Sequence, residues 1–205
     1  MDNSTLPGNP EKPRRLMSIR RMTEASDAEI TTLAAVLAEA FADYAWTNWT
    51  VDSDRREARI AAIHRLYLKH VALPQGEIWT DGDLAGVAVL LPPDAAELPQ
   101  ELVDKLSALH GEAGRRLQTE LPQQPDGTWT LATIGVAPSK QGTGLGTALM
   151  EALLHNADAH SRPVGLETSA ESNLEFYRRL GFVVWAVSEM PSGGQLVWSM
   201  LRNPR

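Results

Sequence analysis

The residues best suited to chemistry lie in a glycine-rich loop, QGTGLG, at residues 141–146. Glycines let several backbone N–H groups converge on one anion, and the start of a helix adds partial positive charge at the same place. β-Branched residues precede the loop, and leucines at helical spacing follow it. We therefore predict a strand, an anion-binding turn and a helix over residues 131–159, with a pyrophosphate as the ligand.

Two other phosphate-binding loops do not fit this stretch. A Walker loop has Lys and then Ser or Thr directly after its last Gly, whereas Thr147 follows Gly146 here. A dinucleotide-binding loop has a third Gly three residues after the second, and Thr147 stands at that position too. Both alternatives are therefore set aside.

A second stretch, LETSAESNLEFYRRLGF at residues 166–182, holds Asn173 and Tyr177 four residues apart. In a helix this spacing puts both side chains on one face, where an amide could hold an amide-rich arm and a phenol could reach the sulfur at its end. A core Tyr beside a helix-capping Asn is the alternative. Glu167, at the end of the preceding predicted strand, is our candidate general base, the alternative being a solvated edge carboxylate.

Together these two stretches resemble the two signatures of the GNAT superfamily of N-acyltransferases. The resemblance implies acetyl-CoA as co-substrate, direct attack by a primary amine in a ternary complex, and no metal. It implies that Tyr177 protonates the departing thiolate and that the backbone N–H near Val136 stabilises the oxyanion. The CoA contacts that it implies come from Ile134, Val136, Gln141, Gly142, Thr143, Gly144, Leu145, Gly146, Thr147 and Asn173.

The acceptor side is expected just after the first predicted helix, where the family places acceptor-binding residues. Tyr44, Trp46 and Trp49 could form an aromatic wall there for a flat or cationic substrate, although core packing remains the alternative for at least one Trp. Small cationic amines, including puromycin-like aminonucleosides, are the favoured acceptors. A peptide or protein N-acetyltransferase and a non-catalytic acyl-CoA sensor are the alternatives.

Composition narrows the remaining function classes. The absence of cysteine excludes disulfides and thiolate metal sites, and a net charge of −7 argues against broad nucleic-acid binding. No stretch approaches the length of a membrane span and no signal peptide is seen, so we expect a cytoplasmic monomer or homodimer that does not bind membranes. Metal-site spacing is also missing, so solvated or capping roles are expected for His64, His70, His110, His155 and His160.

Helices are predicted from apolar residues at three- and four-residue steps. Ser26 and Glu29 form a capping box that begins the first helix, whose apolar face includes Ile30, Leu33 and Leu37. Further helices are predicted over residues 54–71, about 99–120 with a break near Gly111 or Gly114, and about 173–180.

Strands are predicted at residues 18–22, 77–80, 84–91, 164–168, 182–190 and 195–201, besides the one before the glycine-rich loop. The second and third of these are expected to be joined by a tight Asp81-Gly82 turn. The order predicts an α/β (α+β) fold of GNAT type, with a mixed, mostly antiparallel sheet and helices on both faces. One domain is expected over residues 18–205, after a disordered Pro-rich tail at residues 1–17.

Overall fold

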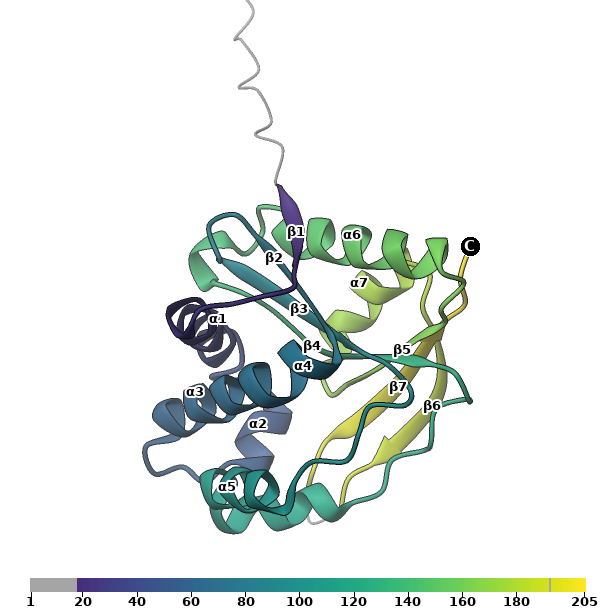
Figure 1. The fold of residues 1–205 in the computed structure, drawn as a ribbon. Helices are drawn as coiled ribbons and strands as arrows, with labels where there is room; N and C mark the ends of the chain where they lie inside the picture. Colours follow the sequence, from purple (N-terminus) through teal and green to yellow (C-terminus); the bar gives the residue numbers. More distant parts are fainter. Residues whose placement is uncertain (1–17, 192) are drawn as a thin grey trace, which may run out of the picture.

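A seven-stranded sheet organises the computed structural model, which describes residues 18–191 and 193–205 (Figure 1). The strand order is β1-β2-β3-β4-β5-β7-β6, and every neighbouring pair is antiparallel except β4 and β5. The predicted tail at residues 1–17 lies outside the described residues. The strands are β1 (Ile19–Met22), β2 (Glu77–Asp81), β3 (Gly86–Leu91), β4 (Trp129–Val136), β5 (Val164–Thr168), β6 (Val183–Glu189) and β7 (Leu196–Arg202).

Helices cover both faces of this sheet, which confirms the predicted fold class (Figure 1). The short α2, α4 and α7 accompany four longer helices. A π-helical turn, Leu68–Ala72, joins α3 to α4, and a 3₁₀ helix, Gly111–Gln118, follows α5. The α-helices are α1 (Asp27–Ala40), α2 (Ala45–Thr50), α3 (Arg56–Tyr67), α4 (Leu73–Gln75), α5 (Gln100–His110), α6 (Leu145–Ala159) and α7 (Leu174–Arg179).

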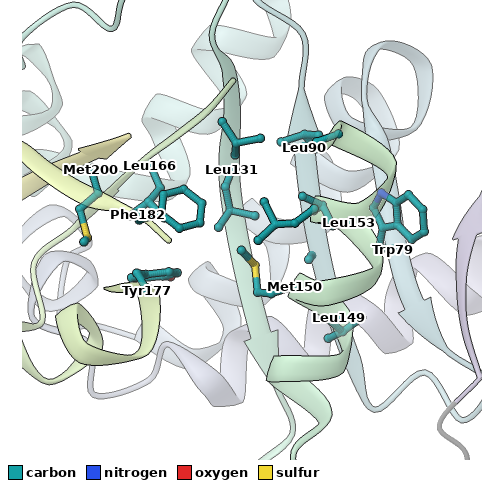
Figure 2. Close-up of a cluster of buried hydrophobic side chains, with 14 of the residues drawn as sticks. Trp79, Leu90, Leu131, Leu149, Met150, Leu153, Leu166, Tyr177, Phe182 and Met200 are labelled. Carbon is teal, nitrogen blue, oxygen red and sulfur yellow. The ribbon is translucent and has the colours of Figure 1, made fainter. Parts of the chain in front are cut away.

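The buried side chains of β3 divide between two cores because successive residues of a strand point to opposite faces. Ala88 and Leu90 pack with α6, and Val87 and Val89 pack with α1. Figure 2 shows the first of these cores, where Leu149, Met150 and Leu153 of α6 face Leu90 and Leu131 of the sheet. The core on α6 therefore holds the helix that follows the glycine-rich loop firmly against β3 and β4.

The capping box at the start of α1 is present as predicted. Ser26 Oγ accepts a hydrogen bond from the Glu29 backbone N–H at 3.2 Å, and Glu29 Oε2 accepts one from the Ser26 backbone N–H at 2.9 Å. Both bonds satisfy N–H groups that have no partner inside the helix.

We expect Ser26→Ala to lower the free energy of unfolding by about 1 kcal/mol, because the Glu29 N–H loses its acceptor. Urea denaturation measures the loss. Ser26→Thr keeps a hydroxyl at the cap and is the matched control, so equal losses in the two variants would contradict this role for the hydroxyl.

The β2–β3 connection differs from the predicted tight Asp-Gly turn. Leu84, and not Gly82, takes the left-handed conformation, with φ of 53°. The buried Asp81 carboxylate explains the difference, because its Oδ1 accepts hydrogen bonds from the N–H groups of Ala85 at 2.8 Å and Gly86 at 2.9 Å. The Asp81 side chain thus closes a β2–β3 loop that is longer than the predicted two-residue turn.

Two helical predictions also change. The stretch that holds Trp46 and Trp49, for which no helix is predicted above, forms the short helix α2. The helix predicted to stop near residue 71 continues through the π-helical turn to Gln75, with Pro74 inside α4. The break between α5 and the 3₁₀ helix falls at Gly111, which is one of the two predicted positions and has a φ of 72°.

Candidate active site

A cavity of about 700 Å³ opens where β4 and β5 separate. The two strands pair only at Trp129 with Val164 and at Thr130 with Gly165. Within the described residues, the rest of β4 has no partner on that side. Opposite β3, Ala132 is an extra residue, because Val89 pairs with Thr133 and Leu90 with Leu131. This bulge turns the end of β4 away from β5 and leaves backbone groups of residues 131–136 beside the cavity.

The glycine-rich loop and the start of α6 form a site suited to an anion. Gly142 and Gly144 have φ values of 73° and 90°, and a Cβ on either would meet no atom within 4 Å. The α6 N-terminus has no side-chain cap, and the first helical hydrogen bond runs from Ala148 N–H to Gly144 O. The N–H groups of residues 145–147 are therefore free of intrahelical partners, as a pyrophosphate-binding site requires.

Side chains of the loop stabilise its own shape. Gln141 Nε2 donates to Val136 O at 3.1 Å, and Thr143 Oγ1 donates to Lys140 O at 2.6 Å. The Leu145 side chain is buried in the core on α6, so it offers a ligand only its backbone. The remaining predicted CoA residues fall into two groups. Those that line the cavity are Ile134, Val136, Gly146 and Asn173. Those that are exposed outside its lining are Gln141, Gly142, Thr143, Gly144 and Thr147.

Tyr177, on α7, also lines the cavity and is 6% exposed. Its ring makes edge contacts with Phe176 and Phe182 at centroid distances of 5.2 and 5.8 Å, and Figure 2 shows it beside Phe182. Burial raises the pKa of the Tyr177 phenol well above its usual value, and the nearby Tyr44 raises it further. The phenol therefore keeps its proton at neutral pH and can act as a donor.

Tyr44 ties the end of α1 to the end of β5. Its hydroxyl accepts a hydrogen bond from the Ser169 N–H at 2.9 Å and lies 3.0 Å from Thr168 Oγ1. Asn173 Nδ2 donates to the same Thr168 oxygen at 3.4 Å. This network joins the predicted acceptor residue Tyr44 to the predicted CoA residue Asn173 across the cavity.

Glu167, the candidate base, is half-buried on β5 and lines the cavity. Gln124 Nε2 donates a hydrogen bond to its Oε1 at 2.9 Å. A Cβ on Gly165 would clash with Gln124 Oε1, so glycine at that position leaves room for the amide where it lies. Gln124 was not anticipated, since it lies outside any motif in the segment before β4.

The two predicted acceptor tryptophans occupy different places. Trp46 lines the cavity, whereas Trp49 is 7% exposed and packs against Met190 and Val197. The centroids of the two rings lie 5.4 Å apart, so the Trp49 ring packs against the Trp46 ring. Trp49 therefore has a packing role, which is the alternative given above for at least one of the two tryptophans.

The cavity also reaches residues of α3 and α5 that sequence reasoning did not assign to the site. Ile63, His64 and Tyr67 line it from α3, and His110 lines it from the end of α5. The expected solvated or capping role is therefore wrong for His64, which lines the cavity wall. His110 keeps a capping role, because its Nδ1 donates a hydrogen bond to the Thr50 carbonyl at the end of α2. The location of both residues follows from helix packing that no local pattern reveals.

The two histidines are neutral at physiological pH. Burial lowers the pKa of His64 to about 4, and the nearby His110 adds to the effect. Burial also lowers the pKa of His110, although its bond to Thr50 O acts in the opposite direction. That bond, 2.9 Å from Nδ1 to a carbonyl that can only accept, puts the proton on Nδ1 and leaves Nε2 as an acceptor.

Among the described residues, no group of three or more His, Cys, Asp or Glu side chains is placed to hold a metal ion. In the same part of the chain no helix has the length and apolar character needed to cross a membrane.

Comparison with known proteins identifies the fold. Residues 100–184 match the model of the acetyltransferase (GNAT) domain. A Corynebacterium glutamicum structure described as histone acetyltransferase HPA2 and related acetyltransferase is 24% identical, with a TM-score of 0.71 over 92% of this chain and 98% of that one. The ribosomal-protein-S18-alanine N-acetyltransferase of Escherichia coli is 15% identical, with a TM-score of 0.52 over 91% and 94%. The chain therefore has the GNAT acetyltransferase fold.

Proposed function

We propose that this GNAT-fold chain is an N-acetyltransferase that moves the acetyl group of acetyl-CoA to a primary amine of a small molecule. One observation carries the proposal: a single cavity brings the proton-bearing Tyr177 phenol and the Glu167 carboxylate to the unpaired end of β4, beside the uncapped α6. The family match over residues 100–184 supports the same chemistry.

In the proposed step the amine nitrogen forms a bond to the thioester carbonyl carbon, and the bond from that carbon to sulfur breaks. The amine proton passes to Glu167, directly or through water, and the thiolate takes the Tyr177 proton. The backbone N–H near Val136 donates to the oxygen that becomes negative. The glycine-rich loop and Asn173 hold the pyrophosphate and the amide-rich arm of CoA.

Glu167→Gln is expected to lower kcat/KM by about tenfold for an amine with a pKa near 7.8. Such an amine costs only about 1 kcal/mol to deprotonate at pH 7, whereas an amine near 10.4 costs about 4 to 5 kcal/mol and should suffer a larger loss. Initial rates of thiol release with matched amines measure both losses. Glu175→Gln removes an exposed carboxylate from α7 and is the control. Equal losses in the two variants would argue against Glu167 as the base.

The acceptor is proposed to be a puromycin-like aminonucleoside or another small amine. The stretches 41–44, 51–55, 129–136 and 166–170 resemble those of puromycin N-acetyltransferase, and they contribute Tyr44, Ile134 and Glu167 to the cavity wall. Acetylation of an antibiotic of this kind would make the enzyme a resistance factor.

Thiol release from acetyl-CoA in the presence of puromycin, simple amines, polyamines, aminoglycosides and short peptides tests the proposal. We expect turnover with small amines. Turnover with peptides alone would identify a peptide N-acetyltransferase instead. Tight CoA binding in calorimetry without thiol release from any acceptor would identify a sensor, and in that case the catalytic proposal fails.

A further inference from the structure

The cavity holds very little charge for a site that receives an amine. Among the described residues that line it, Glu167 is the one Asp, Glu, Lys or Arg. Glu167 lies on β5 beyond the point where β4 and β5 stop pairing, and its carboxylate accepts a hydrogen bond from Gln124. One carboxylate can pair with one ammonium, so the cavity is matched to a substrate with a single amino group.

The residues that α1, α2 and α3 contribute to the cavity wall are mainly rings and aliphatic side chains. The end of α1 contributes Phe41, and α2 contributes Trp46. Three further residues come from α3, namely Ile60, Ile63 and Tyr67. Phe41 also packs against His64, with ring centroids 5.5 Å apart. Such a wall favours a flat or apolar body, and it offers no charged partner to a second ammonium or to a carboxylate.

The two histidines do not add a charge to this wall. His64 is neutral because it is buried, and His110 is neutral with its Nδ1 proton donated to the Thr50 carbonyl. His110 Nε2 can still accept one hydrogen bond from a hydroxyl or N–H group on the substrate body. Polar recognition in this part of the cavity is therefore possible without charge.

We propose that the acceptor is a primary monoamine carried on an aromatic or apolar body, and that polyamines, aminoglycosides and free amino acids are poor substrates. This inference rests on the proposed function and narrows its acceptor class. Inside the cavity, a second ammonium would have no carboxylate left to pair with, and a substrate carboxylate would have no Lys or Arg.

Rates of thiol release for matched acceptors test the inference on the wild-type protein. The set is 2-phenylethylamine, its analogues with an aminomethyl group, a carboxylate or a carboxamide on the ring, which leave the basicity of the reacting amine nearly unchanged, and phenylalanine. We expect kcat/KM to fall about a hundredfold or more when the second ammonium or the carboxylate is added, and to recover when the carboxylate becomes an amide. Spermidine and an aminoglycoside should react as poorly as the diamine.

Turnover of the diamine, spermidine or phenylalanine at the rate of 2-phenylethylamine would overturn the inference and leave the proposed acetyltransferase activity intact. Absence of thiol release with every amine would overturn both. These two failures are therefore distinguishable.

A specificity switch gives a second test. Ile63→Asp adds a carboxylate to the cavity wall, and Ile63→Asn is the uncharged control of the same size. Relative to Ile63→Asn, the Asp variant should raise kcat/KM for the diamine over the monoamine by about tenfold or more. No change in that ratio for a folded Asp variant would contradict the inference, and if the variant does not fold, the wild-type series decides.

Discussion

Tyr177→Phe is expected to lower kcat by about a hundredfold or more, with little change in the Kd for CoA. The Tyr177 phenol lines the cavity next to Asn173 and carries its proton at neutral pH, since burial raises its pKa above the usual value. Loss of a general acid costs about 10²- to 10⁴-fold, because the thiolate must then leave without a proton or take one from water. Pre-steady-state thiol release and calorimetry with CoA separate the two quantities.

The substitution isolates the hydroxyl because the ring remains. Phe at this position keeps the edge contacts with Phe176 and Phe182 and leaves no new cavity in the core on α6. Arg178→Gln, an exposed change on the same helix, serves as the control and should leave kcat within about twofold. An unchanged kcat in Tyr177→Phe would remove Tyr177 from the proposed step and leave its packing role.

The residues proposed for the donor side could be selected from the sequence because they are close together along the chain. The loop, the start of α6, and the pair Asn173 and Tyr177 each depend on turn chemistry or helical spacing within a few residues. The structure brings Ile134, Val136, Gly146, Asn173 and Tyr177 to one cavity, as their order in the chain implied.

The acceptor side could not be predicted in the same way. His64 and His110 come from different helices and meet only because α3 packs against α5. Gln124 reaches Glu167 from an irregular segment, in room left by Gly165. The conformation that positions His110 also depends on a long-range contact, since Asp52 accepts from the Glu112 and Ala113 N–H groups just beyond Gly111. Such contacts follow from tertiary packing and not from local spacing.

His64 is expected to make folding strongly pH-dependent between pH 6.5 and about 4, in addition to His110, whose pKa burial also lowers. The pKa of its side chain falls from an ordinary value of 6.5 to about 4 on folding, because burial disfavours the charged ring. Above pH 6.5 the ring is neutral in both states, and the stability is complete. As the pH falls from 6.5 to about 4, the unfolded chain binds a proton that the folded chain does not, so the free energy of unfolding decreases by about 3 kcal/mol.

Chemical denaturation at a series of pH values measures this decrease in the unfolding free energy. The difference between the wild type and His64→Gln shows how much of it comes from His64. His64→Gln removes the titrating ring, so its unfolding free energy should vary about 3 kcal/mol less than that of the wild type between pH 6.5 and 4. His155→Gln removes an exposed imidazole from α6 and should keep the wild-type pH dependence. Carboxylates such as Asp158, whose pKa Arg202 lowers, contribute mainly below this window. If the unfolding free energy of His64→Gln varied with pH as much as that of the wild type, His64 could not be treated as a neutral part of the cavity wall. The argument for an uncharged acceptor body would then lose one of its supports.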